Sequence, residues 1–296
     1  MTSDYLIDKF STQHNFFRFN TDRFYDYEIK ISADGTIVEY KDKSMAINLT
    51  DCDALYYRKI TLPSLEDYEP RFRELMYREM MSVIEGIAET AGKRAVTRPS
   101  SLRRADNKIV QLKEAKKVGF ILPLSLITNS DASAQSFCSE HQSIIKPISY
   151  GKIVDDAKIG FIQTNLVKQA EDIEGLSCSP AYFQSYENKD YEIRLTIVKH
   201  KLFGVRIDST NKVDWRKEGT ALTYSKIEIP SHIGQKCLMM MENLGINFAA
   251  FDFIVHNDEY FFLELNANGQ WLWLEEQLDL DISSAIMKQL SGEANE

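Results

Sequence analysis

The segment from Phe251 to Gly269 places the strongest constraint on what this chain can fold into. Apolar residues dominate two runs, Ala249–Val255 and Tyr260–Asn266, and a short polar stretch separates them. This pattern is typical of two antiparallel strands joined by a tight turn. Residues two apart on a strand share a face, so Glu264 and Asn266 point the same way. The segment therefore predicts a partly buried hairpin with polar side chains on one face.

The length of the turn decides which side chains of this hairpin meet. We expect a three-residue turn, Asn257–Glu259, which pairs His256 with Tyr260. That register brings Asp252 directly opposite Glu264. Opposed side chains have Cβ atoms about 5 Å apart, so two carboxylates there repel each other, and more strongly where apolar neighbours exclude water. A two-residue turn would put the two carboxylates on opposite faces.

A hard divalent cation would relieve this repulsion. Asp252, Glu264 and Asn266 offer two carboxylates and an amide oxygen, and such all-oxygen ligands suit Mg²⁺, which usually also binds substrate phosphates. The alternative is that both carboxylates are charges on the rim of an ordinary hairpin. The added Asn266, with Gly269 just after it, favours the metal, so we predict these three residues as metal ligands.

A lysine at the end of a hydrophobic strand is the second candidate. Lys146 lies within Ile144–Pro147, where an unpaired ammonium group is costly to bury and a phosphate would satisfy it. The alternative is an edge strand from which the lysine reaches solvent. The following loop, Ser149–Gly151, offers backbone amides to phosphate oxygens. Neither GxxxxGK[ST] nor GxGxxG occurs in the chain, so neither common nucleotide-binding loop supports this site.

A polar hinge and several arginines complete the candidates. The stretch Phe183–Glu187 offers backbone groups to an adenine edge and a carboxylate to ribose hydroxyls, or is simply a strand that leads to a turn. Glu192 and Arg194 share a strand face, and Arg206 lies on the facing strand beyond a turn at Lys199–Lys201. Arg216 follows in the chain. Guanidinium groups that converge near a metal suit a phosphoryl group or a carboxylate, and solvated salt bridges are the alternative for each one singly.

Composition narrows the class of protein. The chain has 296 residues and a net charge of -9, and 44% of its residues are hydrophobic, which indicates a globular protein with a sizeable core. No apolar run approaches the ~20 residues of a membrane-spanning helix, and the start lacks the pattern of a secretory signal. The scattered cysteines and histidines disfavour a zinc site or a disulfide framework. We therefore expect a cytoplasmic protein with no membrane or nucleic-acid partner.

The periodicity of apolar residues predicts a mixed chain of helices and strands. The predicted strands are Tyr27–Ile31, Thr36–Tyr40, Ala54–Tyr57, Ser143–Pro147, Ile159–Ile162, Tyr191–Val198, Leu202–Ile207, Ala249–Val255 and Tyr260–Asn266. The predicted helices are Ser64–Ala91, Asn107–Val118, Ser231–Leu244 and Ile282–Leu290. The stretch from Ser149 to Asp156 is expected to be a loop, and Thr97–Ser101 marks a domain boundary.

In this order the motifs resemble those of an ATP-grasp ligase. The matching pieces are Asp106-Asn107-Lys108, Ile144–Pro147, Phe183–Glu187, Glu192-x-Arg194, Asp214–Arg216 and Asp252…Glu264-x-Asn266. A second set, Tyr56–Lys59, Thr97–Ser100, Arg104–Lys108 and Asp214–Arg216, resembles one branch most closely. This branch is the microviridin-type, or graspetide, maturases, which cross-link ribosomally made precursor peptides.

This resemblance implies an α/β (α+β) chain with an ATP-grasp fold and an N-terminal pre-ATP-grasp domain. The implied domains are residues 1–102, a central lobe at 103–183 and a C-terminal lobe at 184–296, with ATP between the lobes. Lys108 and Lys146 would hold ATP phosphates, and Gln184, Tyr186 and Glu187 would line the adenine and ribose pocket. Asp252, Glu264 and Asn266 would bind two Mg²⁺. Arg194, Arg206 and Arg216 would orient the γ-phosphate and the acceptor carboxylate, and Glu192 takes the place of Asp in the family's Asp-x-Arg pair.

The implied activity is an ATP-dependent ligase that activates Asp or Glu side chains of a precursor peptide as acyl phosphates. Attack by a hydroxyl or an amine of the same peptide would then form an ω-ester or ω-amide cross-link. The implied partners are the leader and core of the precursor, and a second copy of the chain in a homodimer. The alternatives are an ATP-grasp ligase that adds an amino acid to a small molecule or protein tail, and a degenerate nucleotide-binding regulator.

Overall fold

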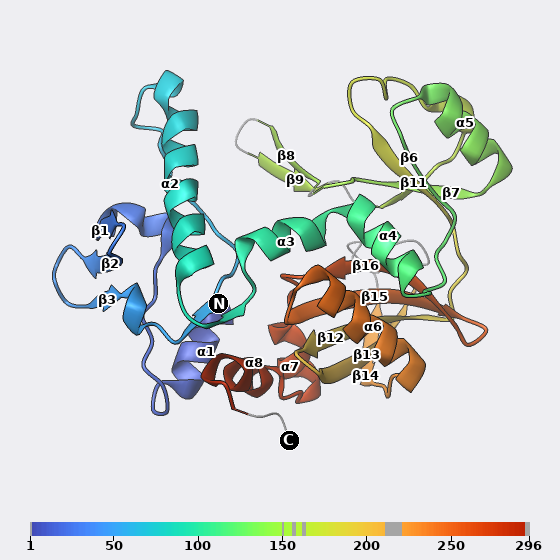
Figure 1. Ribbon diagram of the computed structural model, residues 1–296. Helices are drawn as coiled ribbons and strands as arrows, with labels where there is room; N and C mark the ends of the chain where they lie inside the picture. The colour runs from blue at the N-terminus through green and yellow to red at the C-terminus, as the bar shows by residue number, and fades with distance from the viewer. Residues whose placement is uncertain (1, 150, 156–157, 162–163, 211–220, 294–296) are drawn as a thin grey trace.

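The computed structural model describes residues 2–149, 151–155, 158–161, 164–210 and 221–293, and it mixes helices and sheets as predicted (Figure 1). Its α-helices are α1 Thr2–Phe10, α2 Pro70–Thr90, α3 Pro99–Asp106, α4 Lys108–Lys117, α5 Asp131–Glu140, α6 Ser231–Leu244, α7 Leu272–Leu278 and α8 Ile282–Ser291. Its strands are β1 Tyr27–Ser32, β2 Gly35–Tyr40, β3 Ala46–Asn48, β4 Ala54–Tyr56, β5 Arg94–Val96, β6 Ser125–Thr128, β7 Ser143–Lys146, β8 Lys152–Asp155, β9 Lys158–Phe161, β10 Asn165–Leu166, β11 Ala181–Ser185, β12 Tyr191–Val198, β13 Lys201–Ser209, β14 Leu222–Lys226, β15 Phe248–His256 and β16 Glu259–Asn266. Short 3₁₀ helices span Thr21–Asp26, Leu49–Asp51 and Ala170–Asp172.

The N-terminal part carries the predicted hairpin. β1 and β2 pair antiparallel, β3 joins them, and Tyr27 and Val38 from this sheet pack on Ile87 of α2. β4 instead pairs parallel with β5. The predicted helix from Ser64 begins only at Pro70, because proline has no N–H to donate and fits best in the first turn. The buried residues of α2 lie in its C-terminal half, and its N-terminal half projects away from the neighbouring helices and strands (Figure 1).

The central part is built on a four-stranded sheet with the order β10-β7-β11-β6. Helix α5 packs on one face of this sheet, where Ala134 and Phe183 are fully buried. Strand β7 lies between two neighbours, so the edge-strand alternative for Lys146 is wrong. Lys152–Asp155 forms a strand, β8, and not the predicted loop, because it pairs with β9.

The C-terminal part is built on a five-stranded antiparallel sheet with the order β14-β13-β12-β15-β16. Alternate residues of each strand face opposite sides. Ile193 and Leu195 of β12 join a buried cluster with α3, α4 and α6, whereas Val205 and Ile207 of β13 join a second cluster with α7 and α8. Both faces of this sheet are therefore covered, and Figure 1 shows α6 on one face.

The hairpin β15–β16 differs from the prediction in its turn but not in its carboxylate pair. The turn has two residues, Asn257 and Asp258, with φ of 50° and 63°, and His256 pairs with Glu259. The pairing then shifts by one residue between Asp252 and Phe253. This β-bulge adds a residue to β16 and restores Asp252 opposite Glu264. The predicted turn is therefore wrong, while the predicted opposition of the two carboxylates is confirmed.

The first helix of the chain packs against the last two. Helix α1 lies beside α8 (Figure 1). Leu6 and Phe10 of α1 join the buried cluster that holds Trp271 and Ile286 of the C-terminal region. Glu275 of α7 ties these helices together, because it accepts hydrogen bonds from Tyr5 and Lys9 of α1 and from Ser283 of α8. Sequence reasoning predicted four of the described α-helices and missed α1, α3, α5 and α7, each of which has ten residues or fewer.

The predicted domain boundaries fall inside regular elements. The boundary after residue 102 lies within α3, and the boundary after residue 183 lies within β11. The division into three domains stays a prediction. Among the described helices, none is long and apolar enough to cross a membrane.

Candidate functional site

Two carboxylates and an amide meet on one face of the C-terminal sheet. Asp252 of β15 and Glu264 of β16 oppose each other, and Asn266 lies two residues further on. The Asn266 side-chain nitrogen donates to Asp252 Oδ2 at 3.3 Å and to Glu264 Oε1 at 3.2 Å. Asp252 is only 6% exposed. The predicted trio is thus brought together, and its oxygen-rich donor set fits Mg²⁺ when the amide presents its oxygen.

Each carboxylate also has its own cation. Arg194 Nη1 donates to both Asp252 oxygens, at 2.8 and 2.7 Å, and Lys108 Nζ donates to Glu264 Oε2 at 2.7 Å. All four side chains are largely shielded from solvent, with side-chain exposures of 9 to 18%. The cluster is therefore balanced in charge. Bound phosphates would become the new anionic partners of Arg194 and Lys108. A divalent cation would then take the place of these two side chains at Asp252 and Glu264.

Helix α4 fixes Lys108 at this position. The Asn107 side chain accepts hydrogen bonds from the backbone of Ile109 and Val110 and so caps the helix that Lys108 begins. Gln111 is 2% exposed and exchanges two hydrogen bonds with the backbone of Leu265, at 2.7 and 3.1 Å. This pair locks α4 to β16. Sequence reasoning did not predict this role for Gln111. The one sequence feature that could have indicated it is a polar residue among the apolar positions of the helix.

Lys146 is held by two neighbours on β11. Its Nζ donates to Gln184 Oε1 at 3.0 Å and lies 4.4 Å from the centre of the Tyr182 ring. Gln184 is 1% exposed, and its nitrogen donates to Ser125 and to the Tyr182 hydroxyl, each at 3.2 Å. Gln184 therefore fixes the position of the Lys146 ammonium group through this hydrogen bond. Burial raises the pKa of Tyr182, which keeps this hydroxyl neutral beside the lysine.

The predicted hinge is already tied to the central sheet. The Ser185 amide donates to Leu124 O at 2.8 Å, and the Tyr186 amide donates to Gln142 O at 2.7 Å. The Ser185 hydroxyl donates to Glu187 Oε1 at 2.6 Å. These contacts orient Glu187 but use two of the N–H groups expected for an adenine edge.

Glu192 forms a buried ion pair with Lys189, a lysine that sequence reasoning missed. The two residues are 7% and 8% exposed, and Lys189 Nζ donates to Glu192 Oε1. Glu192 lies on the same strand face as Arg194, two residues away. A buried carboxylate needs such a partner, and Lys189 supplies it.

The structure does not bring Arg206 to the cluster. The turn between β12 and β13 has two residues, since Val198 pairs with Lys201, and not the predicted three. Arg206 consequently lies opposite Ile193, on the other face of the sheet from Arg194. There its guanidinium bonds Asp208 at 2.7 and 2.8 Å and stacks 4.0 Å from the Tyr191 ring. Arg216, and Tyr150 of the predicted phosphate loop, lie outside the described residues.

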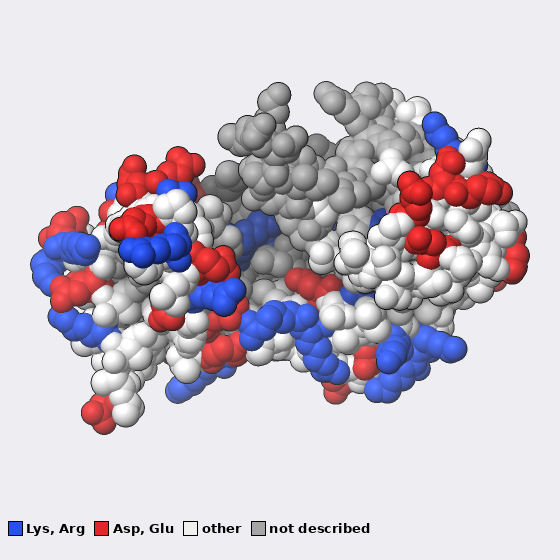
Figure 2. Space-filling view, turned by 90° about the horizontal axis from the view of Figure 1, so that it is seen from above, with Lys and Arg blue, Asp and Glu red and all other residues white. Residues whose placement is uncertain are grey.

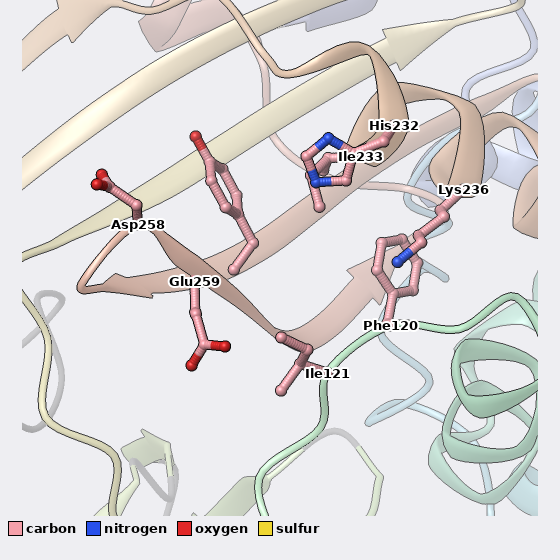
Figure 3. Close-up of a pocket in the computed structure, with 8 residues that line it drawn as sticks. Phe120, Ile121, His232, Ile233, Lys236, Asp258 and Glu259 are labelled. Atoms are coloured by element: carbon pink, nitrogen blue, oxygen red, sulfur yellow. The ribbon is translucent and has the colours of Figure 1, made fainter.

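A cavity of about 170 Å³ lies beside the β15–β16 turn (Figure 3). The cavity is lined by Phe120, by His232 and Lys236 of α6, and by Asp258 and Glu259 of the hairpin. None of the predicted site residues lines it. Phe120 packs on the apolar face of the sheet that α6 covers, so this cavity lies across the sheet from the carboxylates.

Charged side chains on the face seen in Figure 2 are mixed. Basic and acidic side chains are interspersed on the left of the view, whereas on the right the acidic ones gather toward the upper edge and the basic ones along the lower edge. No broad basic surface appears among the described residues in this view.

The family model of the MvdD pre-ATP grasp domain matches residues 4–102. No curated protein matches the sequence significantly. Among solved structures, the macrocyclase MdnC from Microcystis aeruginosa MRC, bound with precursor peptide MdnA, is 27% identical with a TM-score of 0.88 over 99% of this chain and 97% of that chain.

Two further structures extend the likeness. A RiPP-associated ATP-grasp ligase from Chryseobacterium gregarium, in complex with ADP and a leader and core peptide, is 27% identical with a TM-score of 0.86 over 98% of this chain and 92% of that chain. D-alanine–D-alanine ligase from Bacillus anthracis, complexed with ATP, shares the fold alone, at 15% identity and a TM-score of 0.52 over 71% of this chain and 73% of that chain. The predicted resemblance is confirmed: residues 4–102 match the MvdD pre-ATP-grasp domain, and the chain as a whole has the ATP-grasp fold of these peptide macrocyclases and ligases.

Proposed function

We propose that this ligase activates Asp or Glu side chains of a ribosomal precursor peptide and closes them into ω-ester or ω-amide cross-links. The observation that carries the proposal is the balanced cluster of Asp252, Glu264 and Asn266 with Arg194 and Lys108. Such a cluster suits a phosphoryl transfer, in which catalysis consists mainly of positioning and charge stabilisation.

The residues of the cluster have separable roles. Asp252, Glu264 and Asn266 would hold Mg²⁺, which supplies a positive charge that offsets the charge on the transferring phosphoryl group. Lys108 and Lys146 would bind ATP phosphates from two sides, and Glu187 would bind the ribose. Arg194 would bind the acceptor carboxylate or the phosphoryl group once it is released from Asp252. Arg206 and Arg216 remain proposed contacts of the peptide.

The chemistry requires activation because a carboxylate is a poor electrophile. Transfer of the γ-phosphoryl group to the side-chain carboxylate of the peptide gives an acyl phosphate, with ADP as the product. A hydroxyl or amine of the same peptide then attacks the acyl carbon and loses its proton, and phosphate leaves with the bonding electrons. Glu192 lies near Arg194 and would orient the attacking part of the peptide.

The peptide partner is supported by the relatives. MdnC is described with a precursor peptide, and the Chryseobacterium ligase with a leader and a core peptide. We infer that this chain also holds a leader and a core, acts in the cytoplasm as a homodimer, and consists of domains 1–102, 103–183 and 184–296.

Mass spectrometry tests the function directly. The protein is incubated with Mg²⁺, ATP and a precursor peptide encoded beside it. Each cross-link removes about 18 Da, the mass of the water lost in condensation. A mass gain would instead identify a ligase that adds an amino acid, and ADP formation that no peptide stimulates would contradict the peptide substrate.

A further inference from the structure

Arg58 reaches from the N-terminal domain to the loop that follows the metal-ligand candidates. Its Nη1 donates to Asn268 Oδ1 at 2.8 Å and to Asn268 O at 3.3 Å. Its Nη2 donates to Gly269 O at 3.0 Å and to Gln270 Oε1 at 2.9 Å. One guanidinium thus holds three consecutive residues, which a planar group with fixed donors does better than a lysine.

No carboxylate of the described residues pairs with the charge of Arg58. All the hydrogen-bond acceptors found for Arg58 among the described residues are neutral oxygens. Burial and the nearby charge of Arg194 lower the pKa of Arg58. Placing the cation of Arg58 beside that of Arg194 costs free energy. Because Arg58 is nevertheless held in one position, we infer that it has a role other than forming an ion pair.

The loop that Arg58 holds lies directly against Arg194. A Cβ atom on Gly269 would come within 2.8 Å of Arg194 Nη2 and within 2.6 Å of the Ala250 Cβ. Only glycine therefore fits there without a shift of the loop or the arginine. Trp271 supplies a second tie to the N-terminal domain, because its Nε1 donates to the Tyr56 hydroxyl at 3.1 Å.

These contacts form a continuous chain from Arg58 through Gly269 and Arg194 to Asp252. We propose that Arg58 is a positioning residue: it presses residues 268–270 onto Arg194, so that Arg194 and Asp252 keep the geometry in which the cluster accepts a divalent cation with the nucleotide. The proposal rests on the proposed function, because it assigns a task to Arg58 at the same site. It makes the N-terminal domain part of the site without any contact to a reacting atom.

Binding of ADP at a series of Mg²⁺ concentrations, followed by calorimetry, tests this role without any peptide. We expect Arg58→Gln to raise the Mg²⁺ concentration for half-maximal ADP binding by about 10- to 100-fold, the range typical of residues that support a metal ligand. Binding of ADP without Mg²⁺ should stay at the level of the unaltered protein. Arg58→Lys should recover only part of the loss. Gly269→Ala should shift the Mg²⁺ dependence in the same direction while Arg58 is intact.

Arg98 provides a matched control. It too is a partly buried arginine held by neutral oxygens, because it donates to the carbonyls of Ala88, Glu89, Ala91 and Gly92 at the end of α2. Arg98→Gln should lower the unfolding temperature and leave the Mg²⁺ dependence of ADP binding unchanged. An equal shift in this control, or no shift in Arg58→Gln and Gly269→Ala, would overturn the role of Arg58 alone. ADP binding by the unaltered protein that ignores Mg²⁺ would overturn the proposed function and this inference with it.

Discussion

At the scale of single residues, the site depends on pairs of opposite charges that are shielded from water. Asp252 and Glu264 would repel each other strongly if either lost its cation, since shielding from solvent strengthens the interaction. Arg194 and Lys108 supply these cations from β12 and from the start of α4. The same four residues would rearrange around a nucleotide, so a change at one of them affects both the fold and the chemistry.

Replacement of Glu264 by glutamine removes one carboxylate and keeps the shape of the side chain. We expect Mg²⁺-dependent ADP formation with the precursor peptide to fall by at least about 100-fold, because a lost metal ligand should cost at least as much as a lost supporting residue. Steady-state ADP release measures the effect. The control is Glu259→Gln, an exposed carboxylate at the start of the same strand, which should retain its rate. An unchanged rate in Glu264→Gln would exclude Glu264 as a metal ligand.

At the scale of elements, two hairpins show how a turn decides the position of a functional side chain. Both turns have two residues where three were predicted. In β15–β16 a bulge compensates, so Asp252 still meets Glu264. In β12–β13 no bulge shifts the register, so Arg206 lies on the opposite face of the sheet from Arg194. Because strand side chains alternate, an error of one residue moves every side chain to the other face.

The elements themselves were easier to predict than their register. The periodic apolar positions and Gly245, in the left-handed conformation, mark helix Ser231–Leu244 with its observed bounds. The shared face of Glu264 and Asn266 followed from alternation along one strand, whereas Asp252 was placed opposite Glu264 by a wrong turn length and meets it because of the bulge. Gln111 and Arg58 could not be predicted, because their partners lie far along the chain and only the assembled fold brings them together. Lys189 lies only three residues before its partner Glu192, but the sequence pattern did not indicate that both are buried.

The β15–β16 turn offers a test of its own geometry. Asp258 has a φ of 63°, which disfavours residues that have a Cβ atom. Asp258→Gly creates the Asn-Gly sequence that two-residue hairpin turns prefer. We expect the free energy of unfolding to rise by about 0.5 to 1 kcal/mol in denaturant titration, since glycine removes the steric cost of the left-handed conformation.

The β1–β2 turn supplies the control for this change. Asp34 lies in that turn but does not have a positive φ, so glycine relieves no strain there. Asp34→Gly should therefore leave the free energy of unfolding unchanged or lower it slightly, because glycine has more conformational freedom to lose on folding. A destabilised Asp258→Gly protein would contradict the turn geometry of β15–β16.

Glu275 makes the docking of α1 on α7 and α8 depend on pH. Burial alone raises the pKa of Glu275, but hydrogen bonds from Ser283 and Lys9 outweigh it and hold the pKa below its ordinary value of 4.5. A carboxylate with a lowered pKa stabilises the fold above pH 4.5 and loses this contribution as the pH falls through the lowered pKa.

Glu275→Gln should therefore lower the free energy of unfolding by about 2 kcal/mol at pH 7, because the amide cannot accept all the donors around it. The difference from the unaltered protein should shrink below pH 4.5. Denaturant titrations at neutral pH and at a pH well below that value measure both differences. A difference that stays constant with pH would show that the charge of Glu275 contributes nothing.

At the scale of the whole molecule, the two ends of the described chain share one buried cluster. Leu6 is 3% exposed and packs with Trp271 of the C-terminal region. We expect Leu6→Ala to lower the free energy of unfolding by about 2 to 5 kcal/mol, as core truncations do. The loss should appear in tryptophan fluorescence, because Trp271 directly precedes α7, Trp273 lies within it, and both pack in the cluster that contains Leu6. Ile31→Ala, at a residue that is 55% exposed, should change the value by no more than about 0.5 kcal/mol.

The contact of α1 with α7 and α8 also has a consequence for how each copy is made. A ribosome adds about 5 to 20 residues per second, so Leu6 waits roughly 15 to 60 seconds before Ile286 emerges to cover it. During that time the apolar side chains of α1 either remain exposed to solvent or are bound by a chaperone. A product that stops before α8 therefore leaves the apolar face of α1 without the partner that Ile286 supplies.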